Sequence, residues 1–167
     1  MKLRREPRGL HFYDRITGVH TLIDEVLVPV DACDIGPEVA SIALTNACDL
    51  ACPFCYAPKT PHALGFDDLC KWCSELDALG TFEVAFGGGE PTIYKPLGDL
   101  CNALWSETRL GISITTHGHH LSDRLIRQID GSVSIVRLSI DAPEPLYSEI
   151  RMRPLRRMLD LAGRIPA

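Results

Sequence analysis

The spacing of apolar and polar positions predicts a repeated strand-then-helix order over most of this chain. Short runs rich in β-branched and other apolar residues, typical of buried strands, are found at Val39–Leu44, Glu83–Phe86, Ile112–Thr115 and Val133–Ile140. Each run precedes a stretch in which apolar residues recur at steps of three and four, the spacing of one helix face. This alternation favours an α/β fold with parallel strands joined by crossover helices.

Four helices are expected between and after these strands. The first two have apolar stripes, formed by Phe66, Leu69, Cys70, Cys73 and Leu76 in one and by Leu97, Leu100, Cys101 and Leu104 in the other. Ser122 is a suitable N-cap for a third helix that ends near Ile129. A fourth helix is expected to end at Gly163, because glycine commonly follows the last turn of a helix. We therefore predict four β/α units.

The first 37 residues have a different pattern. Two short apolar runs between Leu10 and Glu25 flank the turn dipeptide Thr17-Gly18 and predict a β-hairpin. The proline-containing segment Val26–Pro37 favours a linker. We therefore divide the chain into residues 1–37, a hairpin with its linker, and residues 38–167, a core domain. Because residue 167 follows closely on the fourth helix, we expect this core to lack its C-terminal strands.

Composition narrows the class of protein. The 167 residues are 46% hydrophobic and 23% charged, which is ordinary for one globular domain. The net charge is −5 and no long basic run is present, so no nucleic-acid partner is expected. No apolar stretch approaches the roughly 18 residues of a membrane span, and the N-terminus lacks the apolar core of a signal peptide. We therefore expect no membrane partner and a cytoplasmic location.

Three of the seven cysteines crowd into one short segment. Residues 45–58 read TNACDLACPFCYAP, in which Cys48, Cys52 and Cys55 have the spacing C-x3-C-x2-C. Such crowding suits metal ligation better than a disulfide framework. A structural zinc site is the alternative, but zinc usually takes four ligands in paired spacings. Three thiolates around a [4Fe–4S] cluster leave one iron open to a small molecule, so these cysteines are the expected metal ligands and catalytic residues.

The remaining helical cysteines allow two interpretations. Cys70 and Cys73 form a C-x2-C pair, a spacing that also occurs in redox pairs and in auxiliary clusters. Both residues, however, lie on the apolar stripe of the first helix, as Cys101 does on that of the second. Free cysteine is among the most buried residue types, so we expect these three side chains to pack in the core.

With the cysteine loop placed after a strand and before a helix, residues 38–163 resemble the radical S-adenosylmethionine (radical SAM) superfamily. The resemblance implies a partial (βα) barrel of the TIM type, of which about four β/α units are visible, and it implies S-adenosylmethionine (SAM) as a second cofactor. In that family SAM chelates the open iron, and an electron from the cluster cleaves it to methionine and a 5′-deoxyadenosyl radical. A reductant such as flavodoxin or ferredoxin is expected to supply that electron.

The resemblance also assigns residues to the SAM site. Phe54, which precedes the third cysteine, is expected to contact the adenine. Residues 86–92 read FGGGEPT and match the family's GGE segment. There Gly88 and Gly89 let the backbone approach the ligand, and Glu90 holds the methionyl ammonium group. Without the cysteine loop, the same segment would also fit a simple turn.

Further SAM contacts are expected where the third and fourth strands end. Thr115 belongs to the TTHG segment that ends the third strand, and Ser139 and Asp141 belong to the SID segment that ends the fourth and faces the ribose in relatives. Arg151 stands where relatives often hold the methionyl carboxylate. Taken without the other motifs, Ser139 also fits an ordinary strand residue and Asp141 a turn or helix cap.

A run of histidines follows the third strand. Many relatives have an asparagine in place of His117, so the contacts of this chain differ there. His117, His119 and His120 together could be read as metal ligands, but no fourth partner is evident and the cysteine motif needs none. We expect loop histidines near the mouth of the pocket.

Two functions stay open from the sequence. The first is an enzyme that reductively cleaves SAM for hydrogen abstraction. Residues 4–25 are weakly similar to hairpins of members that mature peptides or cofactors, which favours such a role and a peptide substrate. The alternative is a non-catalytic iron–sulfur scaffold or an inactive fragment that needs a partner, because an incomplete barrel leaves open edges and an unsealed pocket.

Overall fold

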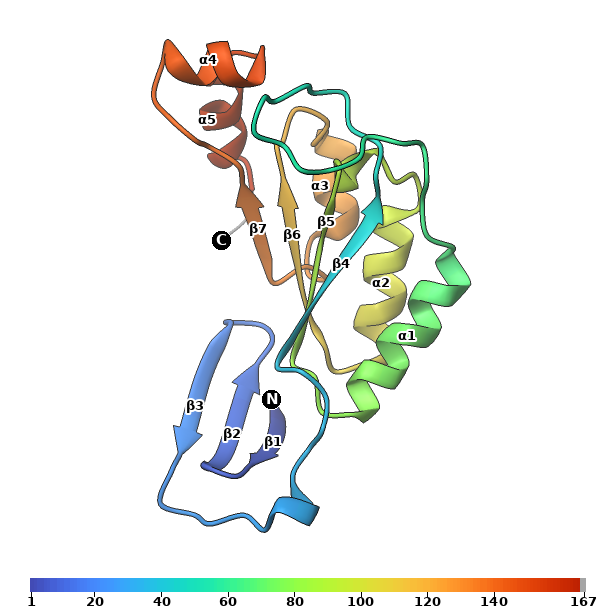
Figure 1. The fold of residues 1–167 in the computed structure, drawn as a ribbon, viewed down its shortest axis with the longest axis vertical. Helices are drawn as coiled ribbons and strands as arrows, with labels where there is room; N and C mark the ends of the chain where they lie inside the picture. Colours follow the sequence, from blue (N-terminus) through green and yellow to red (C-terminus); the bar gives the residue numbers. More distant parts are fainter. Residues whose placement is uncertain (166–167) are drawn as a thin grey trace.

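The computed structural model describes residues 1–165 as two sheets with surrounding helices (Figure 1). Residues 166–167, the end of the expected core domain, lie outside the described residues. The main domain contains β4 (Val39–Thr45), α1 (Phe66–Ala78), β5 (Glu83–Gly88), the short 3-10 helix η2 (Pro91–Ile93), α2 (Leu97–Glu107), β6 (Gly111–Thr116), α3 (Asp123–Ile129), β7 (Ile135–Leu138), α4 (Leu146–Arg151) and α5 (Arg156–Ala162). The predicted strand-then-helix order is confirmed; α4 is an additional short helix that the pattern did not predict.

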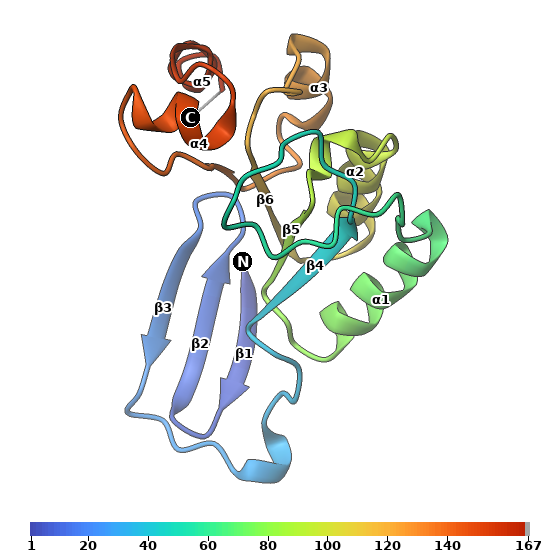
Figure 2. The same cartoon turned by 45° about the horizontal axis from the view of Figure 1, so that its top comes forward.

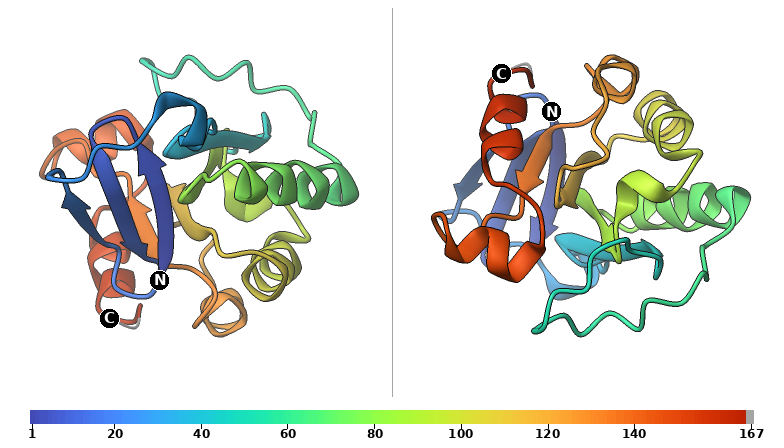
Figure 3. Two further views of the ribbon diagram at one scale, coloured as in Figure 1. Left: turned by 90° about the horizontal axis from the view of Figure 1, so that it is seen from below. Right: turned by 90° about the horizontal axis from the view of Figure 1, so that it is seen from above.

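The main domain is built on one parallel sheet of strand order β4-β5-β6-β7. Helices α1, α2 and α3 cover one face of it (Figure 3). Successive side chains of a strand point to opposite faces, and the helix-covered face carries the fully buried residues Leu44, Val84, Phe86, Ile112 and Ile114. The other face carries small or polar residues, namely Ser41, Ala85, Gly87, Ser113 and Thr115. Within residues 1–165 the sheet is open and does not close into a barrel.

An antiparallel sheet of three strands precedes the main domain. Its strands are β1 (Lys2–Glu6), β2 (Gly9–Asp14) and β3 (Val19–Ile23), and a linker with the short 3-10 helix η1 (Val30–Ala32) leads on to β4. Strands β2 and β3 form the predicted hairpin. Strand β1 was not predicted, because its buried positions are the charged residues Lys2, Arg4 and Glu6.

Aromatic contacts join the two sheets. The fully buried ring of Tyr13 lies 5.4 Å from that of Phe82, centroid to centroid, and its hydroxyl occupies the space that a side chain at Gly111 would need. Arg15 donates to the carbonyl oxygen of Trp105 at 3.1 Å, and its guanidinium lies 3.7 Å from that ring's centroid. The N-terminal sheet therefore packs at the amino ends of β4, β5 and β6 and leaves their carboxyl ends free (Figure 1 and Figure 2).

The helices show the features that their sequences predict. The hydroxyl of Ser122 caps α3 by accepting a hydrogen bond from the Leu125 N–H at 3.2 Å. Cys73 and Cys101 are fully buried in the core, where burial raises the pKa of both thiols to about 12, and Cys70 packs against the same core. Core packing of these three cysteines is confirmed. Among the described helices, none is long and apolar enough to span a membrane.

Candidate functional site

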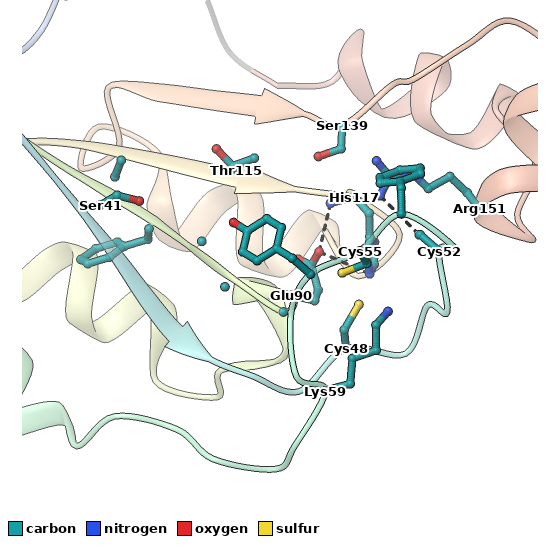
Figure 4. A pocket seen from close by; sticks show the side chains of 17 residues that line it. Ser41, Cys48, Cys52, Cys55, Lys59, Glu90, Thr115, His117, Ser139 and Arg151 are labelled. Atoms are coloured by element: carbon teal, nitrogen blue, oxygen red, sulfur yellow. Dashed lines mark hydrogen bonds and ion pairs between the residues drawn. The ribbon is translucent and has the colours of Figure 1, made fainter.

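A cavity of about 310 Å³ lies at the carboxyl ends of the parallel strands (Figure 4). Ligands commonly bind at this end of parallel α/β folds, because the strand ends and the loops after them meet there. The predicted site residues that line it are Cys48, Cys52, Phe54, Cys55, Gly88, Gly89, Glu90, Thr115, Ser139 and Arg151. The structure thus brings together every predicted site residue except Asp141.

The cysteines belong to a long loop, residues 46–65, that leaves β4 and returns alongside it; we call it the cysteine loop. Its return is held by backbone hydrogen bonds from Asn46 N–H to the His62 carbonyl oxygen, 2.8 Å, and from Leu64 N–H to the Leu44 carbonyl oxygen, 2.9 Å. These bonds fix both ends of the loop on the last residues of the strand. The segment between them carries all three cysteines.

Three thiols of this loop line the cavity. The sulfur atoms of Cys48 and Cys55 face one another in Figure 4, and Cys52 lies on the same side of the cavity as Arg151. All three are free thiols. Burial raises the pKa of Cys48, although the Leu50 N–H, 3.4 Å from its sulfur, partly opposes this. Three unpaired soft ligands on one loop fit an iron–sulfur cluster held by three cysteines, with one iron left open.

The glycine run at the end of β5 has two different roles. Gly88 has a φ of +113°, and a side chain there would collide with the carbonyl oxygen of Thr45, the last residue of β4. A side chain at Gly89 would collide with the carbonyl oxygens of Asn46 and Ala47 at the start of the cysteine loop. Gly89 N–H also donates to the Thr45 carbonyl oxygen at 2.7 Å. By contrast, no described atom lies within 4 Å of the position that a Cβ of Gly87 would take. Gly88 and Gly89 therefore hold the cysteine loop against β5, whereas Gly87 leaves open space in the cavity.

Glu90, the last residue of this segment, is almost completely buried, with 1% of its surface exposed. Its Oε1 accepts hydrogen bonds from Thr92 N–H at 3.0 Å, from the Thr92 hydroxyl at 2.5 Å and from the Thr116 hydroxyl at 2.5 Å. Its Oε2 accepts one from His117 N–H at 3.0 Å. Oε2 accepts this one hydrogen bond, whereas Oε1 accepts three, so Oε2 retains a lone pair for a further donor.

A histidine network ties the cysteine loop to the end of β6. His117 Nε2 lies 3.0 Å from Asp49 Oδ1 and 3.3 Å from Glu90 Oε2, and His120 Nε2 lies 3.1 Å from Asp49 Oδ2. Burial acts to raise the pKa of Asp49, but hydrogen bonds from His120 and His117 outweigh it and lower that pKa to about 2. The prediction of loop histidines near the pocket is met by His117, which lines the cavity while being buried.

Arg151 reaches the cavity from α4. Its Nε and one terminal nitrogen donate to the two oxygens of Asp141 at 2.5 and 2.9 Å, and the other terminal nitrogen lies 3.7 Å from Cys52 Sγ. The hydrogen bond to Asp141 raises the pKa of Arg151, so its positive charge is fixed. The guanidinium carbon lies 5.5 Å from the centroid of the Phe54 ring. Asp141 does not line the cavity and instead orients Arg151.

Sequence reasoning missed several residues of the site. Ser41, Gly87 and Lys59 also line the cavity, and Asp49 joins its network. A signal existed for Ser41, because a serine in an apolar strand at the position facing away from the helices indicates a polar pocket. The position of Asp49, an acidic residue directly after Cys48, was a signal that it lies in the site. Its partners His117 and His120 could not be predicted, because they lie far away in sequence.

Comparison with known proteins identifies the chain's relatives. The family model described as "Radical SAM superfamily" matches residues 42–163. A GTP 3',8-cyclase of Sinorhizobium medicae is 29% identical over 114 residues, covering 62% of this chain and 32% of that enzyme. A PqqA peptide cyclase of Rhodopseudomonas palustris is 32% identical over 118 residues, covering 68% of this chain and 31% of that protein. The chain spans about a third of the length of these curated relatives.

Solved structures show the same fold. The crystal structure of Streptococcus suis SuiB bound to the precursor peptide SuiA covers 98% of this chain and 52% of SuiB, with a TM-score of 0.79 and 17% identity. SuiB bound to S-adenosylmethionine covers 78% of this chain and 30% of SuiB, with a TM-score of 0.68 and 24% identity. The family model covers well over half of the chain and includes both the cysteine loop and the glycine run. The chain therefore belongs to the radical SAM superfamily.

Proposed function

We propose that this chain binds a [4Fe–4S] cluster through Cys48, Cys52 and Cys55 and reductively cleaves SAM to a 5′-deoxyadenosyl radical for hydrogen abstraction. The observation that carries the proposal is that these three thiols and the segment Gly87–Glu90 line one cavity. When bound, the cluster supplies the electron for the cleavage. The family membership supports this function.

The chain's own residues would bind and orient SAM in this cavity. Glu90 Oε2 has room for one more donor, which suits the methionyl ammonium group. Arg151 uses only some of its five N–H groups on Asp141 and Cys52, so others remain for a carboxylate. The half-exposed ring of Phe54 offers a face to the adenine, and the Ser139 hydroxyl offers a partner to the ribose.

The test is anaerobic reconstitution of the full chain with iron and sulfide. We expect about four irons per chain and the formation of 5′-deoxyadenosine when SAM and dithionite are added. Cys52→Ala should lose both, whereas the matched control Cys73→Ala should keep both, because Cys73 lies in the core away from the cavity. A soluble, folded wild type that binds no iron would refute the proposal.

The reaction is proposed to belong to peptide or cofactor maturation. Relatives named PqqA peptide cyclase and GTP 3',8-cyclase, and the fold shared with a structure of SuiB bound to its precursor peptide, support this class. Strand β3 is exposed along its whole length, and within residues 1–165 it pairs only with β2, so its outer edge could receive a peptide as an added strand. We favour a peptide substrate on this ground.

A comparison of additives tests the substrate class. Reconstituted protein should form 5′-deoxyadenosine faster when peptides purified from the host cytosol are added, and GTP should have no effect. A pool hydrolysed to free amino acids is the control. Stimulation by GTP alone would refute a peptide substrate.

We further propose that the protein works in the cytoplasm, because the reducing conditions there suit its free cysteines. A flavodoxin or ferredoxin would act as the reductant.

A further inference from the structure

His117 has an unusual set of partners for a buried histidine. Its side chain is 3% exposed, and it lies between two carboxylates, with Nε2 3.0 Å from Asp49 Oδ1 and 3.3 Å from Glu90 Oε2. Its backbone N–H donates to the same Glu90 oxygen at 3.0 Å. The residue therefore contacts the cysteine loop and the glycine–glutamate segment at the same time.

The hydrogen bonds fix which ring nitrogen carries the proton. His119 N–H lies 3.1 Å from His117 Nδ1, so Nδ1 must act as an acceptor. The hydrogen of the neutral ring is then on Nε2, the nitrogen that faces Asp49 and Glu90. The short turn from His117 to His119 thus orients the ring so that its N–H points at Asp49.

Each carboxylate belongs to a different part of the site. Asp49 directly follows Cys48, so a contact that holds Asp49 also restrains the backbone that carries the first thiol of the loop. Glu90 lies in the segment proposed to hold the ammonium group of SAM. The ring N–H of His117 donates to Asp49 and its backbone N–H donates to Glu90, so this one residue links the cysteine loop to the end of β5. An alanine at position 117 would keep the backbone bond to Glu90 but remove the bond to Asp49 Oδ1, leaving only the contacts of Asp49 Oδ2 with His120 and Arg153.

We propose that His117 is a positioning residue that couples the cysteine loop to the SAM amino-acid site, by holding Asp49 through its ring Nε2–H and Glu90 through its backbone N–H. The inference rests on the proposed function, because it concerns the same cavity. Outer partners that orient metal-binding groups typically change affinity or activity ten- to a hundredfold when removed. For His117 the three cysteines stay in place, so the effect should fall on SAM binding more than on iron content.

The test compares variants of the full chain after anaerobic reconstitution. His117→Ala should retain about four irons per chain, while its Kd for SAM, titrated through the SAM-induced change in the EPR spectrum of the reduced cluster, rises about tenfold. Asp49→Ala should have a similar effect, and the double variant should be no worse than either single one. His120→Ala is the matched control, since its half-exposed ring contacts Asp49 but not Glu90, and its Kd should stay within about twofold.

Other results of these measurements would refute the coupling proposed for His117. A His117→Ala protein with the Kd and EPR change of the wild type would overturn the inference, and so would effects of Asp49→Ala and His117→Ala that simply add. If His117→Ala does not fold, Asp49→Ala alone tests the coupling: an unchanged Kd refutes it and a tenfold rise supports it. A wild type without a cluster would instead refute the proposed function, so the two failures are distinguishable.

Discussion

Substituting Gly89 by alanine tests how the cysteine loop is held against β5. A Cβ at this position would lie 2.6 Å from the Asn46 carbonyl oxygen and even closer to that of Ala47, so the loop must move. Overpacking of this kind costs typically about 1–3 kcal/mol. The shift also weakens the hydrogen bonds from Gly89 N–H to the Thr45 carbonyl oxygen, 2.7 Å, and from Glu90 N–H to that of Ala47, 2.8 Å, each worth about 1 kcal/mol.

The total loss for Gly89→Ala is therefore about 3 kcal/mol of unfolding free energy, or roughly 6–12 °C in Tm for a chain of this size. Gly87→Ala is the matched control two residues away. No described atom lies within 4 Å of its Cβ position, so its stability should change by less than about 1 kcal/mol.

Urea and thermal unfolding of the apo proteins measure the stability of both variants. SAM titration after reconstitution measures their affinity for SAM. We expect Gly87→Ala to weaken SAM binding while leaving stability intact, because its methyl group enters the cavity. Equal losses of stability in both variants, or a Gly89→Ala protein as stable as the wild type, would refute this account of the glycine run.

Three further predictions follow from burial. Burial, reinforced by the nearby His117 and Arg157, lowers the pKa of His119 to about 4. The unfolded chain therefore binds more protons than the folded chain between pH 6.5 and about 4, so the free energy of unfolding should fall by roughly 3 kcal/mol at most as the pH is lowered through this window. In His119→Gln the free energy of unfolding, measured with urea, should depend less on pH there. An unchanged pH dependence would contradict this prediction. When the folded protein is alkylated at pH 8 and analysed by mass spectrometry, Cys73 and Cys101 should stay unlabelled, because their thiols are buried and have a pKa of about 12. Rapid labelling of either cysteine in the folded protein would exclude this packing. Tyr13→Ala should lower the free energy of unfolding by about 3–5 kcal/mol and expose the N-terminal sheet to limited proteolysis, because the buried ring packs on Phe82. Tyr13→Phe keeps the ring and should be about as stable as the wild type. Equal losses of stability in the two variants would show that the hydroxyl, not the ring, matters.

Local signals in the sequence were sufficient for the order of the elements and for finding the three cysteines that we propose as metal ligands. Strand and helix periods depend on neighbouring residues, so four β/α units and the hairpin could be predicted from them. The spacing of Cys48, Cys52 and Cys55 is also local, and parallel strands place all the following loops at one end. This is why the predicted residues meet in one cavity although they come from five different segments.

Other features depend on contacts between distant residues, and only the tertiary structure decided them. Strand β1 is held by paired charges: the buried Lys2 ammonium lies 2.5 Å from Asp77 Oδ1, and no hydrophobic pattern could show this. His117 meets Asp49 across 68 residues and Glu90 across 27. The sequence marks Gly87 and Gly89 as alike, yet one faces open space and the other faces a carbonyl oxygen, because the path of a loop through space is set by packing and not by its own residues.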